Sequence, residues 1–265
     1  MKYKMLVLDM DDTLLNDDHI ISDENRAMLA KAKEKGVQII LASGRPTAAM
    51  IEYAKDLGLM DSYMISFNGG VITDLKKNEV IFEQNLTVEQ IHELYNYSQY
   101  KKTHIITYLD GKVISETRSE YIDIEIDITG LEHEVVPDFK ERVQSPAIKC
   151  ILLEEPTYLK EVEKDLKAAM PHLSICMSKP FFLEVAQTGI DKGASVQYLA
   201  EKLNINQSEI IAIGNAENDL SMIEYAGLGV WVDNVEPELR HKGNLVVASN
   251  NEHGVAEVIQ RFILA

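Results

Sequence analysis

The sequence predicts an α/β protein: a Rossmann-like three-layer core, in which helices cover a parallel sheet, interrupted by an inserted α+β domain. Short apolar runs alternate with capped helical segments at the start of the chain, and the same alternation returns after residue 191. Between the two, hairpin-like strand pairs predominate. We therefore expect a core domain of residues 1–83 and 188–265 and an inserted α+β domain of residues 84–187.

The first segment has the order strand, helix, strand, helix, strand. Its apolar runs are short and lack helical periodicity, as in strands buried on both faces, and lie at 5–8, 37–42 and 63–66. Ser22 can cap the first helix and Gly36 can end it. Pro46 is expected at the first position of the second helix, which Gly58 ends. This order is typical of a parallel sheet.

The later segments continue in chain order. A hairpin at 71–82 and a capping box at 87–90 precede the expected elements of the insert, namely strands at 103–109, 112–115, 148–153, 173–177 and 181–186 and a helix at 156–170. The expected elements of the final segment are helices at 191–203, from about 217 and at the end of the chain, and strands at 209–213, 228–231 and 245–247.

Composition excludes several partner classes. The 43 acidic and 26 basic residues give a net charge of −17, which repels phosphate backbones and anionic membranes, so we expect neither nucleic acid nor a membrane as a partner. Cys150 and Cys176 lie among apolar residues, as buried reduced thiols do. Because the first residues show no signal-peptide core, we expect a cytoplasmic protein.

Two carboxylates follow the first strand. Asp9 and Asp11 lie at the carboxyl edge of the predicted sheet, where parallel sheets bind ligands. Residues two apart in an extended chain point the same way, so both side chains can converge while Met10 presents its backbone. Carboxylates held together repel each other, and a divalent cation relieves the repulsion. A solvated acidic turn is the alternative for this motif alone.

Three further polar clusters lie at strand ends or helix starts. Residues 43–45 (Ser-Gly-Arg) follow the second strand and form an anion site at a helix N-terminus. Lys192 opens the first helix after the insert, and residues 214–219 follow the next strand with oxygen ligands. Each cluster alone could be an ordinary helix start or turn. The four together predict a phosphate and metal site.

In order, DMDDT, ASGRP, the lysine of DKG and GNAENDLSM resemble the four signature motifs of the haloacid dehalogenase-like hydrolases. The insert, with the FNGG segment before it, resembles the Cof-type sugar-phosphatase branch. The resemblance implies a Mg²⁺-dependent phosphatase that acts on small phosphorylated metabolites, such as sugar phosphates, through an aspartyl-phosphate. It also implies that the insert is a cap that selects the substrate.

The resemblance gives each matching residue a role. Asp9 would be the nucleophile, and Asp11 would protonate the leaving group and then deprotonate the attacking water. The implied phosphate-binding residues are Met10 through its backbone, Thr13, Ser43, Gly44, Lys192 and Asn218. The implied Mg²⁺ ligands are Asp9, the main-chain oxygen of Asp11, Asn215 and Asp219.

Asn215 departs from the family pattern, which has aspartate there. An amide oxygen can bind Mg²⁺ but brings no charge, so we expect a weaker metal site and reduced turnover. Two alternatives to a phosphatase follow: a phosphomutase, which shares the nucleophile and the acid, and a phosphometabolite-binding protein with weakened catalysis.

Other residues have two readings each. Glu184 in the insert is a candidate substrate contact, with a solvated side chain as the equal alternative. Trp231 ends a predicted core strand, and we expect it to be buried by packing rather than to contact a ligand. His104, His133 and His172 lack metal-ligand spacing and are expected at the surface.

Overall fold

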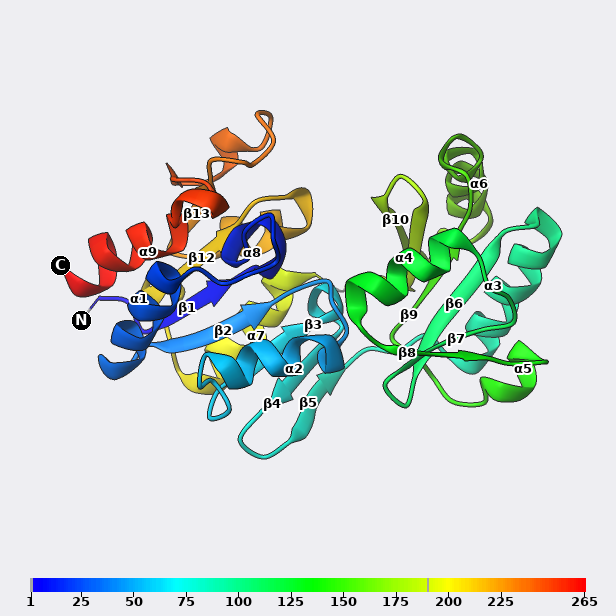
Figure 1. The fold of residues 1–265 in the computed structure, drawn as a ribbon, viewed down its shortest axis with the longest axis horizontal. Coiled ribbons are helices and arrows are strands. Elements are labelled where there is room, and N and C mark those ends of the chain that lie inside the picture. The colour runs from blue at the N-terminus through cyan, green and yellow to red at the C-terminus, as the bar shows by residue number, and fades with distance from the viewer. Residues whose placement is uncertain (1, 190) are drawn as a thin grey trace. The chain divides into compact units, whose positions relative to one another are not determined.

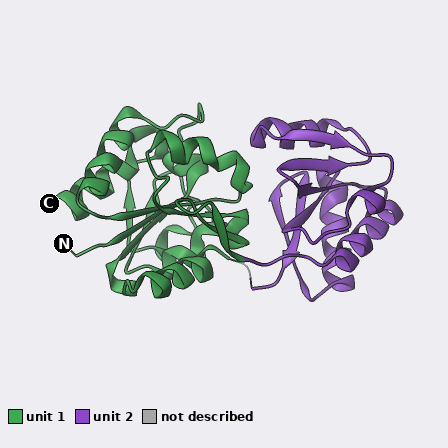
Figure 2. Ribbon diagram, turned by 90° about the horizontal axis from the view of Figure 1, so that it is seen from below, with its two compact units in different colours: residues 1–82, 191–265 green, residues 83–190 purple. Residues whose placement is uncertain are grey.

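The computed structural model describes residues 2–189 and 191–265, and the chain divides into two compact units. Unit 1 consists of residues 1–82 and 191–265, and unit 2 of residues 83–190 (Figure 2). Unit 1 is thus built from the two ends of the chain. Within the described residues, no helix is both long and apolar enough to cross a membrane.

Unit 1 contains an eight-stranded sheet with the order β14-β13-β12-β1-β2-β3-β4-β5 (Figure 1). Its strands are β1 (Met5–Leu8), β2 (Gln38–Ala42), β3 (Tyr63–Ser66), β4 (Val71–Asp74), β5 (Glu79–Glu83), β12 (Ile210–Gly214), β13 (Leu228–Val232) and β14 (Leu245–Val247). β1 pairs in parallel with β2 and β12, and the sheet is parallel from β14 to β3. β4 runs antiparallel to β3.

Helices cover both faces of this sheet. The helices of unit 1 are α1 (Asp23–Glu34), α2 (Thr47–Asp56), α7 (Lys192–Leu203), α8 (Leu220–Tyr225) and α9 (Gly254–Ile259). Leu6 and Leu8 of β1 belong to the core cluster that includes α1, α2 and α9, whereas Met5 and Val7 belong to the cluster with α7 and α8. Alternate residues of β1 thus face opposite layers, which confirms the predicted three-layer core.

Local signals set the helix ends. The Ser22 hydroxyl accepts a hydrogen bond from the Asn25 amide, and Gly36 and Gly58 adopt the left-handed φ values that suit helix ends. The Pro46 prediction was off by one position: Pro46 is the N-cap of α2, which begins at Thr47.

Unit 2 contains a six-stranded sheet with the order β10-β11-β9-β6-β7-β8. Its elements are α3 (Val88–Lys101), β6 (His104–Leu109), β7 (Lys112–Ser115), α4 (Glu120–Thr129), β8 (Glu132–Val135), α5 (Phe139–Arg142), β9 (Lys149–Leu153), α6 (Pro156–Ala169), β10 (Leu173–Lys179) and β11 (Phe182–Gln187). The pairs are antiparallel except β7 with β8. Residues of α3 and α6 pack with alternate strand residues in one core cluster. The capping box of α3 is present as predicted.

Some expectations for unit 2 were wrong or incomplete. No helix or strand was predicted where α4, β8 and α5 lie. Cys150 is buried as expected, but Cys176 is exposed. It lies on the edge strand β10, on the face opposite to the buried Leu173 and Ile175. His172 is exposed, whereas His133 is half-buried and its Nε2 lies 2.8 Å from the Ser115 hydroxyl.

A crowded glycine follows β3. Gly69 has a φ of +103°, and a Cβ placed on it would lie 2.4 Å from the main-chain oxygen of Asp191, the residue before α7. The Ser195 hydroxyl of α7 donates to the main-chain oxygen of Gly69 at 2.8 Å. Only glycine allows this close approach, which fixes the start of α7 against the loop after β3.

We therefore expect Gly69→Ala to destabilise unit 1 by about 2–5 kcal/mol, the sum of left-handed strain and overpacking. Gly36→Ala is the matched control: its φ is +83°, but none of the described atoms lies within 4 Å of the added Cβ, so about 1–2 kcal/mol is expected. Urea unfolding can be followed through the fluorescence of Trp231, the one tryptophan in the chain, which is fully buried. Equal losses in the two variants would contradict this account.

Candidate active site

The predicted site residues gather at one edge of the unit 1 sheet. β12, β1 and β2 are neighbours and parallel, with Leu8 paired to Ile213 and to Leu41, so their carboxyl ends meet at the same edge. The loops that follow these strands carry Asp9, Ser43 and Asn215. The topology thus explains why residues far apart in the sequence share one site.

Lys192 lies at the centre of this site and is fully buried. Its Nζ lies 2.6 Å from Asp9 Oδ1 and 2.6 Å from Asp219 Oδ1. Burial alone would lower the pKa of Lys192, but the charges of Asp219 and Asp9 outweigh it and raise that pKa. The ammonium therefore stays charged and links the loop after β1 to the loop after β12.

Asp219 has both carboxylate oxygens engaged. Oδ1 binds Lys192, and Oδ2 accepts hydrogen bonds from the backbone N–H groups of Asn215 and Ala216 at 3.0 and 3.1 Å. Gly214 allows the loop to close, because a Cβ there would lie 2.5 Å from the Asp219 Cβ. In this arrangement Asp219 anchors Lys192 and its own loop, and its predicted role as a cation ligand stays a prediction.

Asp9 is 5% exposed. Burial, followed by the charge of Asp219, raises the pKa of Asp9 to about 7, against the lowering effect of Lys192. Its Oδ1 binds Lys192, which leaves Oδ2 facing the Asn215 side chain. Asp9 is thus a buried carboxylate with one oxygen held in place.

The Asp11 side chain, which we expected to converge with that of Asp9, is held by Arg45. The Asp11 carboxylate forms a bidentate pair with Arg45, at 2.9 Å to Nε and 2.7 Å to Nη2. β1 ends at Leu8, and Met10, which separates the two aspartates, lies in the short helical turn Met10–Leu14 and not in an extended strand. Burial raises the pKa of Asp11, but the hydrogen bonds and charge of Arg45 outweigh it and lower that pKa.

Three oxygens and the Asn215 carboxamide meet at one point. One terminal atom of that carboxamide lies 3.0 Å from Thr13 Oγ1, 3.2 Å from Asp9 Oδ2 and 3.2 Å from the main-chain oxygen of Asp11. Asp9 Oδ2, the Asp11 carbonyl and an amide oxygen are hard ligands that fit Mg²⁺. The described residues hold no cluster of three or more His, Cys, Asp or Glu that could bind a metal. The donor set therefore fits a cation but brings one carboxylate.

Asn68, which was not predicted as a site residue, contacts two of the predicted ones. Its backbone N–H donates to the Ser43 carbonyl at 3.0 Å, and its Oδ1 accepts from Asn218 Nδ2 at 3.0 Å. A Cβ on Gly44 would lie 3.1 Å from the Asn68 amide. Phe67 and Asn68 both have left-handed φ values, which is uncommon outside glycine. The strained FNGG loop was a signal of this role.

Of the other phosphate-site candidates, Ser43, Thr13 and Met10 are buried, whereas Gly44 is half-buried and Asn218 is exposed. Ser43 is 2% exposed, and its hydroxyl accepts from the Arg45 N–H at 3.1 Å. Thr13 is fully buried beside Asn215, and the Met10 side chain belongs to the core, so Met10 can offer only its backbone. Arg45 belongs to the ASGRP motif, and its pairing with Asp11 could not be predicted from the sequence.

Two single residues have clear environments. In unit 2, the Glu184 side chain is 13% exposed and lies 3.0 Å from Lys149 Nζ, so the reading as a solvated side chain was wrong. Trp231 is fully buried, as expected, and would contact a Cβ on Gly243.

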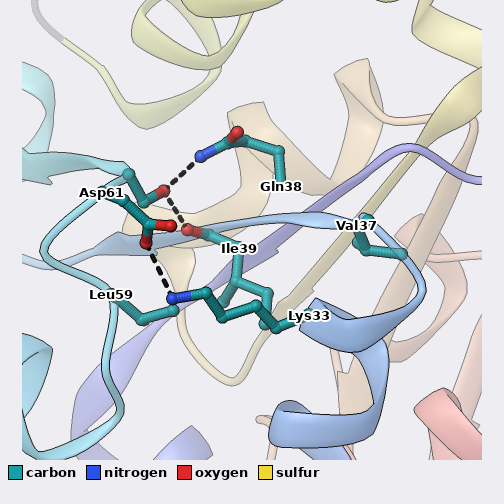
Figure 3. Close-up of a pocket in the computed structure, with 8 residues that line it drawn as sticks. Lys33, Val37, Gln38, Ile39, Leu59 and Asp61 are labelled. Atoms are coloured by element: carbon teal, nitrogen blue, oxygen red, sulfur yellow. Dashed lines mark hydrogen bonds and ion pairs between the residues drawn. The ribbon is translucent and has the colours of Figure 1, made fainter.

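A cavity of about 170 Å³ lies at the opposite end of β2, away from these residues (Figure 3). Its polar lining is satisfied internally: Lys33 pairs with Asp61 at 2.7 Å, and Gln38 donates to the Ser62 hydroxyl, which donates to the Ile39 carbonyl. Nothing in this lining calls for a ligand.

Known proteins resemble this chain over its whole length. It is 34% identical to "Putative phosphatase YxeH" of Bacillus subtilis (strain 168), covering 99% of both chains. It is 31% identical to the 5-amino-6-(5-phospho-D-ribitylamino)uracil phosphatase YcsE of the same strain, covering 98% of this chain and 96% of YcsE.

A solved structure, a haloacid dehalogenase-like hydrolase from Bacteroides thetaiotaomicron, superimposes with a TM-score of 0.94 at 33% identity, covering 99% of this chain and 100% of that one. The family described as haloacid dehalogenase-like hydrolase matches residues 6–259. The match spans all four motifs of the site, and the chain belongs to the haloacid dehalogenase-like hydrolases.

Proposed function

We propose that this chain is a Mg²⁺-dependent phosphatase that hydrolyses small phosphorylated metabolites through an aspartyl-phosphate on Asp9. The observation that supports this best is the buried pairing of Asp9 with Lys192 beside the oxygens of Asp11 and Asn215. A carboxylate fixed in this way can attack phosphorus, and Lys192 together with a bound cation would offset the repulsion of an anionic substrate.

In the first step, the Asp9 carboxylate attacks phosphorus and the bond to the ester oxygen breaks. Asp11 gives its proton to the leaving oxygen, so an alcohol departs. Lys192, Asn218 and the N–H groups after Ser43 hold the phosphoryl oxygens. In the second step, Asp11 takes a proton from water, which attacks the same phosphorus. The Asp9–phosphorus bond breaks, and inorganic phosphate and free Asp9 result.

Asp9, the Asp11 carbonyl and Asn215 would hold the Mg²⁺. When bound, the cation supplies positive charge that stabilises the transferring phosphoryl group.

Asp11 has to leave Arg45 before it can act as an acid. The bidentate pair keeps its carboxylate ionised and lowers its pKa, whereas a general acid needs a proton. The arrangement described here is thus a resting one, and turnover requires Asp11 to rotate toward the leaving oxygen.

We assign substrate selection to unit 2, with Glu184 as the candidate contact, and propose sugar phosphates or similar metabolites as substrates. The activity that YcsE is named for, removal of phosphate from a ribityl chain, supports this class. The second candidate is a phosphometabolite-binding protein with weakened catalysis, which the uncharged Asn215 favours. A phosphomutase would return the phosphate to the sugar.

A panel of phosphorylated metabolites, assayed for released phosphate at fixed Mg²⁺, tests the proposed function. We expect Asp9→Asn to abolish phosphate release and Asp11→Asn to reduce it by about 10²–10⁴-fold. Mg²⁺ with beryllium fluoride should form a stable adduct on Asp9. Adduct formation without phosphate release from glucose phosphates would point to a mutase, and no adduct would point to the binding protein.

The Asp11–Arg45 pair predicts a pH-dependent coupling. Because the folded-state pKa of Asp11 is lowered, the pair stabilises the fold above the unfolded value of about 3.9 and loses this effect as the pH falls through the folded value. A double-mutant cycle of Arg45→Gln and Asp11→Asn should give about 1 kcal/mol at pH 7, since Asp11 is partly exposed. Urea unfolding should show this coupling shrinking in acid. A pH-independent coupling would contradict the pairing.

A further inference from the structure

We propose that the side-chain nitrogen of Asn215 takes the position of the cation when none is bound. When the cation enters, the side-chain amide rotates so that its oxygen faces the cation. This inference rests on the cation site of the proposed function, but it does not require that the protein hydrolyse phosphate esters. It concerns the one residue of the site that departs from the family's aspartate.

The contacts of one atom support this orientation. The carboxamide atom that faces the site has three oxygen neighbours: Thr13 Oγ1 at 3.0 Å, Asp9 Oδ2 at 3.2 Å and the Asp11 carbonyl at 3.2 Å. If that atom is the amide oxygen, Thr13 donates to it, but it faces a carboxylate and a carbonyl. If it is nitrogen, its two N–H groups are distributed over three acceptors. The nitrogen orientation therefore satisfies the site.

The distribution of charge gives the same answer. Lys192 binds Asp9 Oδ1 and Asp219 Oδ1, and two backbone N–H groups bind Asp219 Oδ2. Asp9 Oδ2 then faces the Asn215 side chain. A neutral donor suits this oxygen, whereas aspartate at position 215 would bring a second carboxylate within about 3 Å of it and repel it.

Thr13 allows both orientations. A hydroxyl is a donor and an acceptor, so Thr13 Oγ1 can accept from the amide nitrogen or donate to the amide oxygen from the same place. When the amide turns by about 180° about its Cβ–Cγ bond, its oxygen joins Asp9 Oδ2 and the Asp11 carbonyl as cation ligands. Cation binding must therefore displace internal hydrogen bonds, which an aspartate would not offer.

The test compares the wild-type chain with Asn215→Asp in EDTA and in Mg²⁺. We expect Asn215→Asp to melt at a lower temperature than wild type in EDTA and to gain more from Mg²⁺, with an affinity by calorimetry at least about tenfold tighter. Asn218→Asp is the matched control, because it adds the same charge to the same loop at a residue that bonds Asn68. Asn218→Asp should show neither the lower melting temperature in EDTA nor the larger gain from Mg²⁺.

A second measurement on the wild-type chain covers the case in which Asn215→Asp does not fold without metal. The Asn215 side-chain NH₂ signals, assigned by their loss in Asn215→Ala, should be protected from hydrogen exchange in EDTA and lose that protection as Mg²⁺ saturates the site. Equal melting of wild type and Asn215→Asp in EDTA, or unprotected signals, would overturn the inference. Inactivity on every phosphorylated substrate would count against the proposed function alone.

Discussion

The buried ammonium of Lys192 is the interaction on which the site depends. An isolated charge in a protein interior is prohibitively costly, and two carboxylates within 2.6 Å make this one tolerable. To bring them there, the chain places glycine where backbones approach each other: Gly69 against the start of α7, Gly193 against α8 and Gly214 against Asp219. Removing Lys192 would leave two buried carboxylates without their shared counter-charge, so the loops after β1 and β12 both depend on this one residue of α7.

Much of the fold and of the candidate site could be predicted from the sequence, because the patterns that indicate strands, helix caps and strand ends are local. Buried strands, the Ser22 cap, the Thr87 capping box and polar residues at strand ends each follow from a few neighbouring residues, and parallel topology then brings Asp9, Ser43 and Asn215 to one edge. The family resemblance, which the comparisons confirm, placed Lys192 among them.

The features that could not be predicted from the sequence depend on contacts between residues far apart in the chain or on backbone conformations that several residue types allow. The Asp11 carboxylate pairs with Arg45, which lies 34 residues away, and no pattern of neighbouring residues indicates this partner. Asn68 reaches the site because its backbone is left-handed. Asparagine tolerates this conformation but does not require it, so the sequence does not predict it. The helix α4, with the sequence EYIDIEIDIT, alternates isoleucine and acid as a strand would, yet Ser119 caps it and Gly130 ends it.

The discontinuity of unit 1 has a consequence for synthesis on the ribosome. Asp9 and its partner Lys192 are 183 residues apart, and β12, which pairs with the central strand β1, is made after the whole of unit 2. At typical elongation rates, roughly 10–40 s pass between the synthesis of Asp9 and that of Lys192. Unit 2 is contiguous and can fold during that interval, whereas one side of β1 stays an open edge. The nascent chain therefore exposes an unpaired, apolar strand for the longest part of its translation, the period in which chaperone binding would matter most.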